Sequence, residues 1–166
     1  MLPLGGIELG MQSKKHYNKT EGCRYMDYKN NSYFKGLDFG NHHPITIEDL
    51  KEVEDAVGIR FPQQYKELML FSNGAVGEVG NSYLTLWELE DVQDFYDDCC
   101  QDDLFNIVLF ASDGAKMGYG FDKSKSLTIV SVPLDSLEMD YVEFCANTFD
   151  EFMEYLYNYN WDEEQF

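Results

Sequence analysis

The chain has 166 residues and a formal net charge of −19 at pH 7. A chain of this length usually forms one domain, which buries roughly 70% of the surface that its unfolded form exposes. The acidic excess repels polyphosphates and attracts basic proteins, so we exclude nucleic acid as a partner. No apolar run approaches the roughly 18 residues of a membrane helix, and we expect no membrane partner. The N-terminus lacks the pattern of a secretory signal, which predicts a cytoplasmic protein.

No pattern in the sequence is typical of a metal site, a cofactor site or a catalytic centre. The four cysteines lack C-x-x-C spacing, and the three histidines have no carboxylate or cysteine at ligand spacing. No histidine follows Pro44 to act as a general base, and neither a G-x-S-x-G elbow nor a complete P-loop is present. We therefore expect unreactive thiols, no metal, no cofactor and no enzymatic activity.

The N-terminal part of the chain differs from the rest in composition. Residues 1–43 contain six basic and four acidic residues, and glycines mixed with Lys, Asn and Gln argue against an independent core. We expect residues 1–32 to form a partly ordered N-terminal extension and residues 33–166 to form the domain. Apolar side chains near this boundary can pack on the domain as a strand or a short helix: Tyr25, Tyr28, Tyr33, Phe34, Leu37 and Phe39.

Residues 45–58 predict a helix with a signal at each end. Thr46 is placed as an N-cap, and Asp49 three residues later approximates a capping box, so the helix should begin near Ile47. Gly58 should end it as a C-cap. The residues at helical spacing that form its apolar stripe are Leu50, Val53 and Val57.

Pro62 predicts a second helix directly afterwards. Proline suits the first turn of a helix, because it lacks an N–H and its φ is already near helical values. Asn73-Gly74 should end this helix, and its apolar stripe consists of Tyr65, Leu68, Met69 and either Phe71 or Ser72.

Beyond Asn73 the pattern changes to strands. Alternating residues predict a strand at 82–86, and short apolar runs predict strands at 106–111, 117–121 and 127–132. Turn residues separate the last three, so an antiparallel meander is the economical topology. Thr148 then predicts the N-cap of a terminal helix that lays one apolar face on the sheet, formed by Phe149, Phe152, Met153, Leu156 and Tyr157.

The densest acidic block, residues 87–103, contains no Lys or Arg. We predict a helix there from about Glu90 to Cys99, with Val92, Phe95, Tyr96 and Cys99 turned to the core. The block has two competing interpretations, a solvated helix face and a docking surface for a cationic partner. A calcium loop lacks support, because the EF-hand pattern of ligands, central glycine and terminal Glu is missing.

Trp87 opens the acidic block. We expect it in the core, since large aromatic residues are highly buried on average, with the docking surface as the alternative. The residues that we predict to bind a partner are Glu88, Glu90, Asp91, Asp94, Phe95, Tyr96, Asp97, Asp98, Asp102 and Asp103. In this interpretation the carboxylates speed encounter with a basic protein, and aromatic neighbours slow its release.

The order of these parts resembles the SUKH superfamily, the Smi/Knr-type domain, over about Tyr33 to Asn160. Two features depart from the family pattern. Ala75 stands where a second glycine often follows Asn-Gly, and the N-terminal extension is basic. The segments that carry the resemblance are Phe61-Pro62, Tyr65, Leu68, Asn73-Gly74, Phe110–Gly114, Gly120-Phe121-Asp122, Ile129-Val130 and Thr148–Phe152.

The resemblance implies a fold and a function. The fold is α+β, a single domain whose central antiparallel β-sheet is flanked by two N-terminal helices, an acidic middle helix and a C-terminal helix. The function is that of a binding module: bacterial members look like immunity proteins that bind and neutralise a cognate polymorphic or contact-dependent toxin. A basic nuclease would suit the charge of this chain. The alternative is a regulatory scaffold or adaptor with a non-toxin partner, as in fungal cell-wall signalling.

Overall fold

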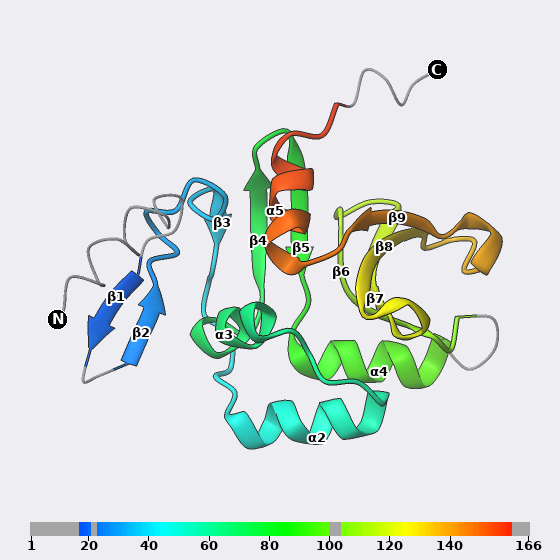
Figure 1. The fold of residues 1–166 in the computed structure, drawn as a ribbon, viewed down its shortest axis with the longest axis horizontal. Coiled ribbons are helices and arrows are strands. Elements are labelled where there is room, and N and C mark those ends of the chain that lie inside the picture. Colours follow the sequence, from blue (N-terminus) through cyan, green and yellow to red (C-terminus); the bar gives the residue numbers. More distant parts are fainter. Residues whose placement is uncertain (1–16, 21–22, 100–103, 161–166) are drawn as a thin grey trace, which may run out of the picture.

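A seven-stranded antiparallel sheet is the frame of the molecule (Figure 1). The computed structural model describes residues 17–20, 23–99 and 104–160. The strands neighbour one another in chain order, which confirms the predicted meander. They are β3 (Leu37–Asp38), β4 (Ala75–Val79), β5 (Ser82–Leu86), β6 (Ile107–Ser112), β7 (Met117–Asp122), β8 (Thr128–Pro133) and β9 (Glu143–Ala146).

Two of these strands, β4 and β9, were not predicted from the sequence, and β3 was expected only as one of two alternatives, a strand or a short helix. Each is short or interrupted: β3 has two residues, and β4 contains Gly77. Gly77 is required there because a Cβ would lie 2.3 Å from the carbonyl oxygen of Gly36 on the neighbouring segment. Its φ of +156° also lies at the edge of the region that favours glycine. The close approach of the two backbones therefore requires a glycine in β4, and this glycine interrupts the alternation of apolar side chains by which a strand is recognised in a sequence.

Four α-helices are present among the described residues, and they complete the predicted α+β architecture. They are α2 (Ile47–Val57), α3 (Gln63–Phe71), α4 (Leu89–Cys99) and α5 (Phe149–Tyr157). Figure 1 shows α5 lying along β4 and β5, while α2 and α4 lie beside each other away from it. A separate hairpin, β1 (Tyr17–Thr20) and β2 (Cys23–Met26), precedes the sheet, and short 3-10 turns η1 (Lys123–Lys125) and η2 (Met139–Tyr141) join strands.

The caps of α2 confirm the predicted boundaries. The Thr46 hydroxyl accepts a hydrogen bond from the Asp49 N–H at 3.1 Å, and the Asp49 carboxylate accepts one from the Thr46 N–H at 2.8 Å. Gly58 ends the helix in the left-handed conformation, with φ of 79°. Capping was readable because each partner lies within three residues of the other along the chain.

Glu54 is the exception on α2, since it lies on the buried stripe and is only 5% exposed. Its carboxylate accepts a 2.7 Å hydrogen bond from the Phe61 N–H, and Lys66 Nζ lies 3.8 Å away. A buried carboxylate is tolerated where such partners replace water. Glu54 therefore joins α2 to the start of α3, where Pro62 takes the N-cap position just before the first turn.

The core lies on both faces of the sheet. The larger cluster packs the sheet against α2, α3 and α5, with Tyr65, Phe110 and Phe121 in its centre. Successive residues of β6 point to opposite faces, so Ile107 and Leu109 belong to a second, smaller cluster. We call this second cluster, formed by Leu104, Ile107, Leu109, Val130 and Val132, the small core. It is covered by Trp87 just before α4, by Phe95 and Tyr96 within α4, and by residues of the β8–β9 connection.

The apolar residues of 28–39 also pack on the domain. Tyr28, Phe34 and Leu37 are buried in the larger cluster, while Tyr33 and Phe39 are partly buried against it. Leu37 lies in β3, so the expectation of a strand in this segment is confirmed.

Candidate functional site

The helix α4 presents an acidic surface to solvent, as predicted. Val92 is buried, and five carboxylates on the other side are exposed: Glu90, Asp91, Asp94, Asp97 and Asp98. We call these five residues the acidic face. The helix carries no Lys or Arg to offset them. The field above α4 is therefore strongly negative and attracts cations.

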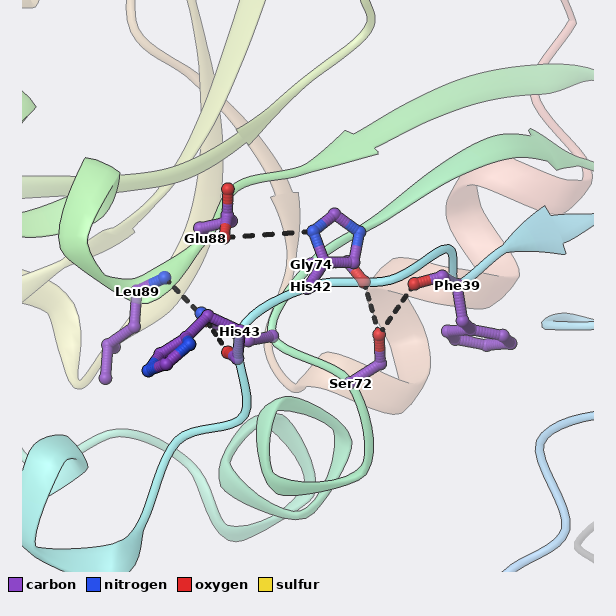
Figure 2. A network of polar contacts seen from close by, with 8 residues as sticks. Phe39, His42, His43, Ser72, Gly74, Glu88 and Leu89 are labelled. Atoms are coloured by element: carbon purple, nitrogen blue, oxygen red, sulfur yellow. Dashed lines mark hydrogen bonds and ion pairs between the residues drawn. The ribbon is translucent and has the colours of Figure 1, made fainter.

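The start of α4 is fixed by a residue from the end of α3. Asn73 is buried, and its side-chain oxygen accepts a 2.8 Å hydrogen bond from the Leu89 N–H. Its side-chain NH₂ donates a 3.0 Å hydrogen bond to the His43 carbonyl. Figure 2 shows His43 and Leu89 held on either side of this link. The sequence identified Asn73 only as the end of a helix, but the fold makes it the anchor of the acidic helix.

Three further contacts hold the same junction (Figure 2). The Ser72 hydroxyl lies 3.2 Å from the Phe39 carbonyl and 2.7 Å from the Gly74 carbonyl. Glu88, one of the predicted binding residues, is half-buried, and its Oε2 lies 3.8 Å from His42 Nδ1. Glu88 therefore serves the junction as well as the charge of the surface.

A hollow of about 330 Å³ opens beside the acidic face. The rings of Trp87 and Phe95 meet there with centroids 5.1 Å apart, and both residues are half-buried against the small core. Asp91, Asp94 and Asp98 line the same hollow. Trp87 thus combines both expectations: it packs on the core and also borders a surface hollow. Aromatic rings beside carboxylates form a favourable environment for an arginine or lysine side chain.

Tyr96 has a different position from the rest of the predicted set. Its hydroxyl accepts a 2.7 Å hydrogen bond from Lys123 Nζ and lies 3.2 Å from the Phe105 carbonyl oxygen. These contacts tie α4 to the turn before β6 and to η1, so Tyr96 stabilises the site. Asp102, Asp103 and the side chain of Cys99 lie outside the described residues.

A second hollow, of about 360 Å³, lies between α2 and α4. Asp49 and Glu52 from α2 line it together with Glu88, which directly precedes α4, and Glu90 from α4. Nothing in the sequence pairs these two helices, because they are separated by α3 and two strands. The acidic surface is therefore larger than the block of residues 87–103 that the sequence indicated.

Cys145 has no reactive character in this fold. Its side chain is buried, and burial raises the pKa of the thiol, although hydrogen bonds with Ser131 and Tyr155 act in the opposite direction. A thiol with a raised pKa stays protonated at neutral pH and is a weak nucleophile. Within the described ranges, no group of three or more His, Cys, Asp or Glu side chains is placed to hold a metal ion.

The family model of the SMI1 / KNR4 family (SUKH-1) matches residues 44–155. The chain therefore belongs to this family, which confirms the resemblance. A search of curated proteins finds no match. None of the helices in the described part of the chain is long and apolar enough to cross a membrane.

Proposed function

We propose that this protein is a non-enzymatic binding module that acts as an immunity protein for a cognate basic toxin, such as a nuclease. Membership of the SUKH-1 family supports a binding role. The observation that carries the proposal is the acidic face of α4, five exposed carboxylates beside the Trp87–Phe95 hollow. A basic toxin offers the charge that this surface lacks.

Two physical effects contribute to the proposed binding, one to the association rate and one to the dissociation rate. The acidic face attracts the partner over a distance comparable with the Debye length, about 8 Å at physiological salt, and so raises the association rate. The aromatic rings of Trp87 and Phe95 lie beside three of these carboxylates, where a desolvated contact slows dissociation. Neutralisation follows when the bound protein covers the toxin's active surface.

The test is protection by matched charge variants. The toxin-like domain encoded in an adjacent reading frame is expressed with the wild type, with the triple variant Asp91→Asn/Asp94→Asn/Asp98→Asn, or with the control Glu67→Gln/Glu78→Gln/Glu154→Gln. Both variants remove three exposed carboxylates, but only the first set lines the hollow. We expect the first variant to lose protection and the control to keep it.

Two outcomes contradict the proposal. Equal protection by both variants, with unchanged thermal unfolding, places the binding surface elsewhere. Capture of a regulatory host protein, together with the absence of any toxin-like neighbour, identifies a scaffold instead.

A further inference from the structure

The last strand of the sheet, β9, has an unpaired side. It pairs with β8 alone, through Ser131 opposite Glu143, Val130 opposite Phe144 and Ile129 opposite Ala146. No other strand in the described part of the chain pairs with it. In an antiparallel strand the N–H and C=O groups of alternate residues point to opposite sides, so β9 directs part of its backbone groups away from β8. Such an edge is a template for another strand.

Exposed apolar side chains accompany this edge. Met139 and Tyr141 in η2 are 40% and 52% exposed, and Phe144 in β9 is 61% exposed. Natural edge strands are usually protected by short length, charge or a covering element. The strand β9 is itself short and carries the exposed Glu143, but three large exposed apolar side chains lie within six residues of one another in η2 and β9. Such a group of exposed apolar side chains is typical of a binding surface.

The charges around this edge select the kind of partner. Glu138, Asp140 and Glu143 are exposed beside the three apolar residues, and the sequence has no Lys or Arg after Lys125. A second copy of the chain would bring these carboxylates, and two net charges of −19, against each other. Like charges directly opposite each other destabilise a strand pair. A basic partner would place opposite charges across the strand pair, which stabilises the pairing.

We propose that β9 binds an extended segment of a basic partner protein by β-strand addition. Backbone hydrogen bonds to the free edge supply the pairing, Met139, Tyr141 and Phe144 contact apolar side chains of the segment, and Glu138, Asp140 and Glu143 contact its Lys or Arg side chains. The surface is built from the C-terminal part of the sheet, so it stands whether or not the acidic face of α4 binds a toxin.

The test uses a synthetic eight-residue peptide of alternating Lys and Val. Hydrogen exchange of the full chain is measured with and without it. At a peptide concentration ten times its dissociation constant, we expect the solvent-facing amides of residues 143–146 to exchange about tenfold more slowly. A peptide methylated on alternate backbone nitrogens keeps the charge but cannot pair, and we expect its binding to fall below detection.

Two protein variants complete the test. Phe144→Lys should lower the affinity for the Lys-Val peptide at least tenfold. Tyr83→Lys adds the same charge at an exposed aromatic residue of β5 and should keep the affinity within twofold of the wild type. Equal binding of the methylated peptide overturns the proposal, as does protection confined to α4. A dimer in sedimentation that Phe144→Lys dissociates also overturns it, because the occupant would then be a second copy.

Discussion

The N–H of Leu89 donates a hydrogen bond to the side-chain oxygen of Asn73 over 2.8 Å. Leu89 is the first residue of α4, so this bond satisfies one of the helix N–H groups that have no partner within the helix. Asn73 also holds the His43 carbonyl. A single buried amide thus joins the end of α3, the segment before α2 and the helix that carries the acidic face.

Replacing Asn73 by Ala should destabilise the fold and loosen the acidic helix. The change leaves the Leu89 N–H and the His43 carbonyl without this partner, at a cost of about 2 kcal/mol in the free energy of unfolding. Urea denaturation measures it. The control is Asn41→Ala at an exposed position, expected within about 0.5 kcal/mol of the wild type. Equal stability of the two variants would remove Asn73 from its anchoring role.

Replacing Glu54 by Ala should cost more than replacing an exposed glutamate. The change leaves the buried Phe61 N–H without its acceptor and Lys66 without its carboxylate, which lowers the free energy of unfolding by about 3 kcal/mol. Glu54→Gln retains an acceptor oxygen and should cost less. The control, Glu67→Ala, removes an exposed carboxylate from α3 and should change stability by less than about 0.5 kcal/mol. A cost for Glu54→Ala no larger than the control's contradicts the structure.

Tyr65 should make the fold sensitive to alkaline pH. Burial raises its pKa above the ordinary value of 10.0, so the folded chain holds this proton more tightly than the unfolded chain. The resulting stability is complete below pH 10 and is lost as the pH rises above it. Burial also raises the pKa of Tyr119 and Tyr155, which adds to the effect.

The variant Tyr65→Phe separates this contribution. Above pH 10, each such tyrosine lowers the free energy of unfolding by about 1.4 kcal/mol per pH unit, and Tyr65→Phe should remove the contribution of one tyrosine. Urea denaturation at pH values from about 7 to 11 measures this change. Among the described residues the Tyr65 hydroxyl has no hydrogen-bond partner, so at pH 7 the variant should match or exceed wild-type stability by about 1 kcal/mol. Tyr83→Phe, at an exposed ring, is the control. An unchanged alkaline slope in Tyr65→Phe counts against the prediction.

Trp87 and the acidic face should affect different rate constants for the proposed partner. Trp87→Ala removes an aromatic contact and should raise the dissociation rate about tenfold or more, with little change in association. Asp91→Asn/Asp94→Asn/Asp98→Asn should lower the association rate and its salt dependence. Surface plasmon resonance at low and physiological salt measures both. Tyr83→Ala is the aromatic control, and a salt-independent association rate of the wild type argues against electrostatic steering.

The sequence predicted the elements whose signals are local. The capping box of Thr46 and Asp49, the C-cap at Gly58 and the N-cap at Thr148 each involve residues within a few positions, and all three are present. The strand at 82–86 was predicted from alternation, and β6, β7 and β8 were predicted from apolar runs between turn residues, because these determinants lie within each short segment. The acidic helix was predicted within one residue of its observed start for the same reason.

The elements without a local signal were missed. The strand β9 has the sequence EFCA, which no periodicity identifies, and it becomes a strand because β8 supplies hydrogen-bond partners. Glu54 lies at a core position that polarity alone assigns to the surface, and only the Phe61 N–H seven residues later explains its burial. The predicted partner-binding role of the acidic residues stays a prediction.

The sequence by itself determined the family, the helix caps, the meander and the acidic character of α4, since these depend on neighbouring residues and on composition. The tertiary structure decided which surfaces these elements form. It placed carboxylates of α2 and α4 around one hollow, set Trp87 against Phe95, engaged Tyr96 with Lys123 and left one side of β9 unpaired. The reason is that such surfaces arise from contacts between residues far apart in the chain, and packing alone brings those residues together.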